Sequence, residues 1–380
     1  MAEPIYLDYN ATTPCDPRVV QAMLPYFSEI YGNPSNGLHI LGRKAARAIY
    51  IAREQISALI GASPREIIFT SGATESNHLA ILGSIEFAPV HRRKIITCAI
   101  EHKAVLAPSK RLVEHGFELI VLPVDVNGLI NISELKKIID TNTFLVSIQT
   151  ANNEIGTLQP IAEISEIAHY YGALVHTDAA QAVGKIPISV QELGIDFLSM
   201  SAHKMYGPKG IGALYHRYSE NSIPIRPLFE GGGQEFGLRA GTSNVPAIVG
   251  FGTACEIAIE EIPSEIVRIR NYRDELETQI LNHISHVWIN AFNAPRLPNT
   301  TNLTIEGIEA DAFLLQIPEL MMSNGAACNT GALEPSHVLL AIGLSRQQAN
   351  ASIRISLGRM TKKVDIQKVV EKLKKAQENS

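Results

Sequence analysis

The stretch DFLSMSAHKMYGPKGIGALY, residues 196–215, joins two short apolar runs through a turn rich in glycine and proline. The runs Asp196–Ser201 and Ile211–Tyr215 have the length and composition of buried β-strands. Lys204 is the third residue after the first run, so the stretch predicts a lysine at the end of a strand. A lysine chosen at random is usually an exposed surface residue, and only its surroundings can favour a functional interpretation.

Similar apolar runs recur between residues 45 and 215 and alternate with amphipathic helical patterns, such as Ile132–Asp140 and Ile161–Tyr171. Five further strands are expected at Glu66–Thr70, Lys94–Ala99, Glu118–Leu122, Thr143–Gln149 and Ala173–Thr177. This alternation predicts an α/β fold with a seven-stranded, mostly parallel sheet.

The pattern changes near Ile248. A long helix is expected there, covering Val249–Glu261 and continuing through Arg270–His283, followed by a shorter α+β segment that ends with the helix Lys363–Gln377. We therefore expect a large domain formed by residues 16–250. Residues 1–15 and 251–380 are expected to form a smaller α+β domain.

The bulk composition is that of an ordinary globular protein of two domains. The chain has 380 residues, of which 46% are hydrophobic and 19% charged, and its net charge is −5. That charge argues against direct nucleic-acid binding. We find no apolar run of about 18 residues and no signal-peptide pattern after Met1. A cytoplasmic protein without membrane contact is therefore expected.

Polar residues follow the ends of several predicted strands. Because ligands bind beyond the carboxyl ends of parallel strands, these residues are expected to gather on one rim of the sheet. They are Ser71–Ser76, Glu101–Lys103, Asn152–Glu154, His176–Asp178 with Gln181, and Ser201–Lys204. A random surface would scatter them.

Two parts of this rim are suited to a cofactor that carries an aldehyde and a phosphate. The Lys204 amine can form a Schiff base with an aldehyde, and Ser201 and His203 beside it can bind a phosphate. Gly72 and Thr74 begin a predicted helix, whose free N–H groups and dipole attract a phosphate. The alternative for this second part is a plain helix cap with no ligand.

Three further residues have two interpretations each. Asp178 is either a capping or ion-paired residue, or the carboxylate that keeps the ring nitrogen of pyridoxal phosphate (PLP) protonated. His102 is either structural, or stacks on a cofactor ring and moves protons. Arg354 alternates with apolar neighbours as in a strand, and its carboxylate partner is either another side chain or a substrate.

The four cysteines are Cys15, Cys98, Cys255 and Cys328, and no two of them form a C-x-x-C pair. Neither a zinc cluster nor a disulfide framework is therefore expected. Cys98 and Cys255 are interpreted as small buried hydrophobes, and Cys15 is ambiguous. Cys328 lies in SNGAACNTG, residues 323–331, whose small residues suit a mobile or exposed loop, and it is the best candidate for a nucleophile.

Taken together, these segments closely resemble the cysteine desulfurases (NifS/IscS-like), in the class-V branch of the fold-type-I PLP enzymes. The resemblance extends from Tyr6–Pro14 to Leu357–Arg359. The longest matching stretches between these ends are Ser71–Asn77, Glu101–Leu106, Asn152–Gly156, Ser201–Leu214, Arg239–Thr242 and Leu333–Val338.

The resemblance implies PLP as the cofactor and a role for each matching residue. Lys204 would carry the cofactor, Asp178 would pair with the ring nitrogen, and His102 would stack on the ring. Arg354, helped by Asn153, would hold the substrate carboxylate. The remaining cofactor contacts would come from Ala73, Thr74, Asn153, Gln181, Ser201, His203 and, from the partner subunit of a homodimer, Thr242.

The implied reaction converts L-cysteine to L-alanine. Lys204 would remove the α-proton, and the Cys328 thiolate would take the sulfur as a persulfide and pass it to an acceptor protein. Ala-Ala-Cys stands where cluster-assembly members usually have serines, and their C-terminal extension is not seen after the last helix. Cluster assembly, transfer-RNA thiolation and DNA phosphorothioation are therefore all possible destinations of the sulfur.

Two alternatives stay open from the sequence. Another class-V activity, such as an aminotransferase or a selenocysteine lyase, would use the same cofactor, but a transaminase has no need of Cys328. A non-catalytic sulfur-relay protein would keep the fold alone, and the intact set of Lys204, Asp178 and His102 argues against it.

Overall fold

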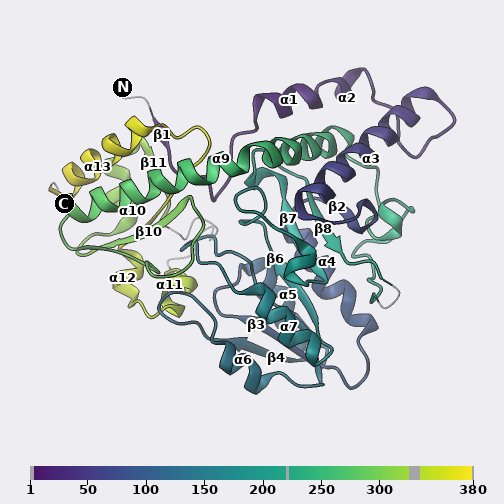
Figure 1. The fold of residues 1–380 in the computed structure, drawn as a ribbon, viewed down its shortest axis with the longest axis horizontal. Helices are drawn as coiled ribbons and strands as arrows, with labels where there is room; N and C mark the ends of the chain where they lie inside the picture. Colours follow the sequence, from purple (N-terminus) through teal and green to yellow (C-terminus); the bar gives the residue numbers. More distant parts are fainter. Residues whose placement is uncertain (1–3, 220–221, 325–333, 379–380) are drawn as a thin grey trace.

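A seven-stranded sheet forms the centre of the computed structural model, which describes residues 4–219, 222–324 and 334–378 (Figure 1). Cys328 lies outside these described residues. The strand order is β2-β8-β7-β6-β5-β3-β4, and β8 alone among the seven runs antiparallel to its neighbours. The strands are β2 (Ile67–Thr70), β3 (Lys94–Cys98), β4 (Glu118–Leu122), β5 (Thr143–Ser147), β6 (Leu174–Asp178), β7 (Phe197–Ser201) and β8 (Gly212–His216). The predicted seven-stranded, mostly parallel sheet is therefore confirmed.

Helices cover both faces of this sheet, as the two-sided burial of its strands requires. Successive residues of a strand point to opposite faces, so Ile95 packs with one hydrophobic cluster and Ile96 with another. One face is covered by α3 (Ile40–Ile60), α6 (Ile132–Ile138), α7 (Ile161–Tyr170), α8 (Val190–Leu193) and the first half of α9 (Val245–His283). The other is covered by α4 (Ala73–Ser84) and α5 (Lys103–Val113).

A second, smaller sheet follows in the chain and has its own hydrophobic cluster. It is antiparallel, with the order β12-β10-β9, and consists of β9 (Val287–Ile289), β10 (Thr300–Ile305) and β12 (Ser352–Ser356). Its cluster includes Ile269 and Leu276 of α9 and residues of α13 (Lys363–Glu378). The remaining elements are α1 (Pro17–Met23), α2 (Pro25–Ser28), α10 (Ala310–Gln316), α11 (His337–Ala341), α12 (Arg346–Asn350) and the parallel pair β1 (Ile5–Tyr6) and β11 (Leu320–Met321).

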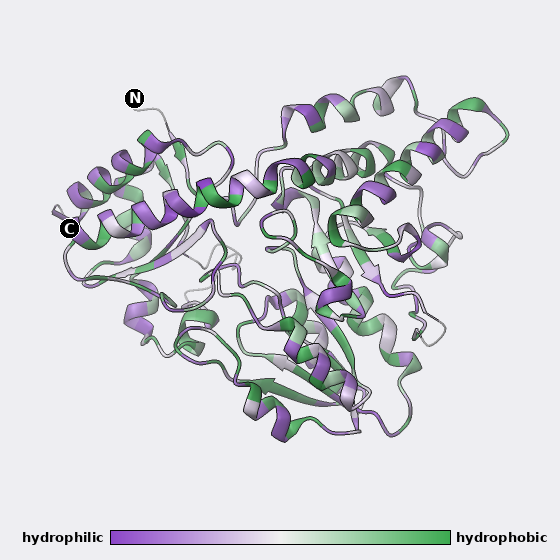
Figure 2. Cartoon of the chain, in the orientation of Figure 1, coloured by the Kyte–Doolittle hydropathy of each residue, from purple (hydrophilic) through white to green (hydrophobic). Residues whose placement is uncertain are grey.

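The helix α9 joins the two sheets and is continuous through Pro263 (Figure 1). It begins at Val245, four residues before the predicted start, because the Asn244 side chain accepts from the Ala247 N–H and caps it. Figure 2 shows mixed hydrophobic and hydrophilic colouring along α9 and α13, which is typical of helices with one buried side. The predicted domain limit at residue 250 falls inside α9, and the domain limits stay a prediction.

No helix within the described ranges is both long and apolar enough to cross a membrane.

The start of α4 packs directly on the backbone of β8. A Cβ atom on Gly212 would lie 2.5 Å from the Met200 carbonyl oxygen and 2.6 Å from the Gly72 Cα, so only glycine fits there. We predict that Gly212→Ala displaces the start of α4 and destabilises the protein by about 1–3 kcal/mol, the usual cost of overpacking. Thermal denaturation measures the change as a lower melting temperature. Gly37→Ala is the control, because no atom lies within 4 Å of its added Cβ, and equal melting temperatures for the two variants would contradict the prediction.

Candidate active site

A cavity of about 570 Å³ opens at the carboxyl ends of the parallel strands. Ten of the twelve candidate residues line it: Ala73, Thr74, His102, Asn153, Asp178, Gln181, Ser201, His203, Lys204 and Arg354. Of the other two, Thr242 lines a separate cavity of about 170 Å³, and Cys328 lies outside the described residues. The expectation that the strand ends share one rim is therefore confirmed for residues that follow β2, β3, β5, β6 and β7.

The start of α4 borders this cavity through Gly72, Ala73 and Thr74. Gly72 is the capping residue and makes no side-chain cap hydrogen bond, so the first-turn N–H groups have no side-chain partner from it. A Cβ on Gly72 would stand 3.6 Å from the Ser201 Oγ, which places that hydroxyl close to the helix start. Together with the helix dipole, these donors form an anion-binding corner.

Asp178 ends β6 and is 8% exposed. Its Oδ2 accepts from the Asn77 Nδ2 at 2.7 Å, and its Oδ1 accepts from the Ala180 N–H at 3.0 Å. Both of these donors are neutral, so they orient the carboxylate without cancelling its charge. The Asn77 Oδ1 is buried and has no hydrogen-bond partner among the described residues. Both Asp178 and Asn77 line the cavity, where their oxygens can meet a positively charged or N–H-bearing ring.

Lys204 reaches the N-terminal segment of the chain. Its Nζ donates to the carbonyl oxygens of Asn10 and Ala11 at 2.6 and 2.8 Å. The next residue, Thr12, is 3.1 Å from the His203 Nδ1 through its Oγ1, and the Thr13 N–H donates to the His203 carbonyl. Residues 10–13 thus cross the carboxyl ends of the strands and form hydrogen bonds with both His203 and Lys204.

Asn10, Ala11 and Thr12 also line the cavity, although they were not among the predicted site residues. The polar run Asn10–Thr13 directly after an apolar start was the available signal, but nothing local places that run on the sheet.

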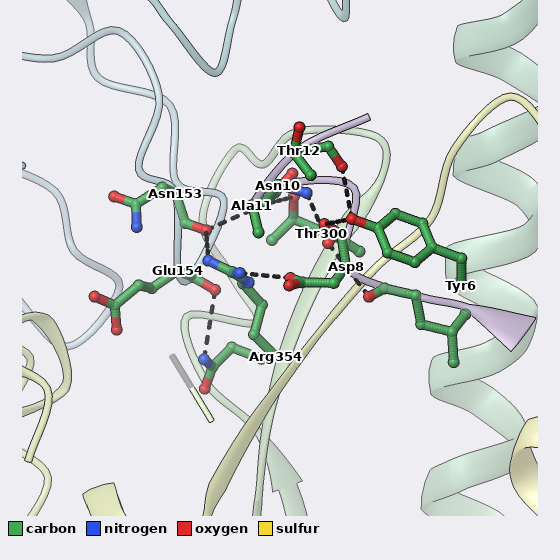
Figure 3. Close-up of polar contacts among 12 residues, drawn as sticks. Tyr6, Asp8, Asn10, Ala11, Thr12, Asn153, Glu154, Thr300 and Arg354 are labelled. Atoms are coloured by element: carbon green, nitrogen blue, oxygen red, sulfur yellow. Dashed lines mark hydrogen bonds and ion pairs between the residues drawn. The ribbon is translucent and has the colours of Figure 1, made fainter. Parts of the chain in front are cut away.

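Arg354 comes from β12 and its guanidinium lies between two acceptors (Figure 3). Its Nη2 donates to the Asp8 Oδ1 at 2.6 Å, and its Nη1 donates to the Asn153 carbonyl at 3.0 Å. The sequence left two possible carboxylate partners for Arg354, another side chain or a substrate. The structure shows a side chain, that of Asp8. The Nε is buried without a hydrogen-bond partner among the described residues. Because an unpaired buried donor is costly, this N–H favours a further acceptor in the cavity.

His102 is the capping residue of α5, and its Nδ1 accepts from the Ala104 N–H at 3.1 Å. That hydrogen bond occupies the Nδ1 lone pair, so in the neutral ring the proton is on Nε2. His203, which lines the same cavity, is neutral near pH 7, because burial and then the charges of Lys204, Lys209 and Lys185 lower its pKa to about 4.

Two buried carboxyl groups lie next to cavity residues in the sequence. Burial raises the pKa of Glu101, which precedes His102, to about 8. Burial likewise raises the pKa of Glu154, which follows Asn153, to about 7, although its hydrogen bond from Ser336 and the charge of Arg354 oppose the shift. Near neutral pH both groups therefore hold a proton for much of the time, which the sequence did not predict.

The three described cysteines are poor nucleophiles. Cys98 and Cys255 are fully buried, as predicted, and burial raises the pKa of both thiols. Cys15, which the sequence left ambiguous, is partly buried, and burial followed by the charge of Asp16 raises its pKa as well. A thiol with a raised pKa carries little of the reactive thiolate.

Glu101 makes the stability of the protein depend on pH. Its folded-state pKa of about 8 lies above the ordinary value of 4.5, so its contribution is fully present below about pH 4.5 and is lost as the pH rises through about 8. Glu101→Gln imitates the protonated acid and cannot ionise. We predict that its free energy of unfolding falls less than that of the wild type between about pH 5 and pH 9.

Urea denaturation at both pH values measures this difference. Glu114→Gln, which changes an exposed carboxylate on α5's C-terminal side, is the control and should keep the wild-type pH dependence. An equal loss of stability in Glu101→Gln and the wild type would show that Glu101 is ionised in the folded protein.

Comparison with known proteins gives a consistent picture. The family model described as "Aminotransferase class-V" matches residues 5–369. A protein named "Cysteine desulfurase IscS" from Rickettsia akari (strain Hartford) is 46% identical over 363 residues, which cover 96% of this chain and 88% of that protein. Among solved structures, "NIFS-LIKE PROTEIN" aligns with a TM-score of 0.91 and 39% identity, covering 99% of this chain and all of that one. "SspA in complex with cysteine" aligns with a TM-score of 0.81 and 42% identity, covering 93% and 98% of the two chains.

Proposed function

The chain belongs to the cysteine desulfurases of the class-V aminotransferase family, a PLP-dependent group, and from this premise we propose how its residues convert L-cysteine to L-alanine. The observation that carries the proposal is the meeting, in one cavity, of Lys204, Asp178 and the uncapped start of α4. These three features match the aldehyde, the ring nitrogen and the phosphate of PLP.

The cavity residues fit this cofactor well. The buried, unpartnered Asn77 Oδ1 and the Asp178 carboxylate face the space that a protonated ring would fill. When bound, PLP supplies an aldehyde that combines with amines and an electron-poor ring that accepts charge from the substrate's α-carbon. In our proposal Ala73, Thr74, Ser201 and His203 hold the phosphate, and Gln181 and Asn153 lie near the ring oxygen.

Three residues are proposed to act on the substrate. Lys204 would hold the cofactor and, when not bound to it, would remove the α-proton of the substrate. Arg354 binds the substrate carboxylate with the donors that Asp8 and Asn153 leave available. His102 stacks on the cofactor ring, and its Nε2, which carries the proton, serves the proton transfers to and from the thiol.

Cys328 is proposed as the thiolate that takes the substrate's sulfur, and both flanks of its segment support this. On one side Ser323 pairs with the Arg354 backbone, donating its N–H to the Arg354 carbonyl at 3.3 Å. On the other side the Ser336 hydroxyl donates to the Glu154 carboxyl at 2.5 Å, and the His337 Nε2 is 2.9 Å from the Glu101 carbonyl.

These contacts lie beside the cavity. Arg354 lines the cavity, and Glu101 and Glu154 are chain neighbours of the cavity residues His102 and Asn153. The persulfide formed on Cys328 is passed to an acceptor protein in our proposal.

A homodimer is proposed to complete the cofactor site. Thr242 lines a cavity of about 170 Å³ that shares Gly210 with the main cavity, so the two cavities are neighbours. Phe229 and Phe236, in the segment before Thr242, are 67% and 62% exposed, as suits a subunit contact. In the dimer Thr242 would bind the phosphate in the partner's cavity.

We predict that Cys328→Ala stops sulfide release from L-cysteine but leaves PLP bound. The thiol is needed to break the carbon–sulfur bond, whereas the proposed cofactor contacts are made by other residues. Sulfide and alanine are measured together in the presence of a reductant, and bound PLP is measured by its visible absorption. Lys204→Ala is the matched variant and should lose both turnover and the absorption of lysine-bound PLP. Normal sulfide release by Cys328→Ala would assign the nucleophile to another residue.

Asp8 and the substrate carboxylate are expected to compete for Arg354. Asp8→Asn keeps an acceptor at 2.6 Å from the guanidinium but removes the competing charge, which is worth about 1 kcal/mol or more at this distance. We predict a several-fold lower KM for L-cysteine with kcat little changed, measured by steady-state kinetics. A higher KM would mean that Asp8 orients Arg354 for the substrate instead of competing with it.

A further inference from the structure

The side-chain amide of Gln181 has its orientation fixed by two partners. Its Oε1 accepts from the Lys185 Nζ at 2.6 Å, and its Nε2 donates to the Asn10 carbonyl at 2.9 Å. An amide can be turned over to exchange its oxygen and its nitrogen, but a backbone carbonyl only accepts and an ammonium only donates. Both partners therefore require the same orientation of Gln181.

Lys185 also bonds to Asn10, the residue whose carbonyl accepts from the Gln181 Nε2. Its Nζ donates to the Asn10 Oδ1 at 2.9 Å, so Lys185, Asn10 and Gln181 close a ring of three hydrogen bonds. Asn10 is in turn held by its N–H, which donates to the Ser356 Oγ at 3.0 Å. The ring is thus attached to the second sheet and does not depend on surface side chains.

The bonds made by Lys185 do not require that it be charged. Burial lowers the pKa of Lys185 well below its ordinary value, and the positive charges of Lys204 and Arg354 lower it further. A neutral amine still has two N–H groups, one for each of the two oxygens that it contacts. The orientation of Gln181 is therefore the same in either protonation state of the lysine.

We propose that Lys185 is a positioning residue which, through Gln181, presents an N–H donor to the ring oxygen of the cofactor. Gln181 lines the cavity and has a second Nε2 hydrogen that the Asn10 carbonyl does not use. The inference rests on the proposed function, which places Gln181 near that oxygen. An N–H favours the anionic form of a ring oxygen, whereas a turned amide would direct its own oxygen at the same charge.

If Lys185 served only to stabilise the fold, its replacement would lower the melting temperature and leave cofactor binding unchanged. A lysine amine with so few polar partners and a depressed pKa is costly to bury, and a methionine fills a similar volume without that cost. Lys185→Met should therefore keep or raise the melting temperature while it weakens cofactor binding. Loss of function without loss of stability is typical of residues kept for a site.

The test uses the apoprotein titrated with PLP, and it reads the PLP dissociation constant and the visible absorption maximum. We expect Lys185→Met to raise the dissociation constant roughly tenfold, the effect of one charge-assisted hydrogen bond, and to shift the absorption maximum. In a Gln181→Ala background the same substitution should change neither reading, because residues that act as a unit are not additive.

Lys94→Met is the matched control. Lys94 is a buried lysine that lies at the end of β3 away from the cavity, and it bonds to the Asp140 carboxylate and the Ile138 carbonyl. It should bind PLP as the wild type does. An unchanged dissociation constant and spectrum in Lys185→Met, or an equal effect with and without Gln181, would overturn the proposal. A wild-type protein that fails to bind PLP would instead overturn the proposed cofactor site.

Discussion

The geometry of the cavity depends on Asn10, a residue only 1% exposed whose hydrogen-bonding groups all have partners. Its carbonyl accepts from Gln181 and Lys204, and its side-chain oxygen accepts from Lys185 and Asn299. The side-chain nitrogen donates to the Asn153 carbonyl and the Thr300 Oγ1, as Figure 3 shows in part. Because each buried group left unpaired would cost about 1–3 kcal/mol, these contacts fix the N-terminal segment between the two sheets.

These hydrogen bonds of Asn10 explain how two sheets with separate hydrophobic clusters form one site. Thr300 and Ser356 belong to the small sheet, whereas Gln181 and Lys204 follow strands of the large one. Asn10 bonds to all four and so sets the position of β12 relative to the carboxyl ends of β6 and β7. Arg354 can then face a cavity whose other walls come from the large sheet.

Patterns within short stretches of sequence predicted the features that depend on neighbouring residues in the chain. The buried apolar runs predicted the seven strands, and the rule that ligands bind beyond parallel strand ends predicted half of the residues that line the cavity, including Asp178 and Lys204. Asn10, Lys185 and the choice of Asp8 as the partner of Arg354 could not be obtained in this way. The Asn10–Lys185 and Asp8–Arg354 contacts join residues 175 and 346 positions apart, so no window of sequence contains them.

The charges around the cavity follow from the same packing. Lys204 and Arg354 bring positive potential to a site that we assign to a phosphate and a substrate carboxylate. Glu101 and Glu154 would weaken that potential if both were ionised, yet burial raises their pKa values to about 8 and about 7. Burial thus keeps Glu101 and Glu154 protonated for much of the time near neutral pH, and the walls of the cavity stay suited to the phosphate and the carboxylate that we assign to it.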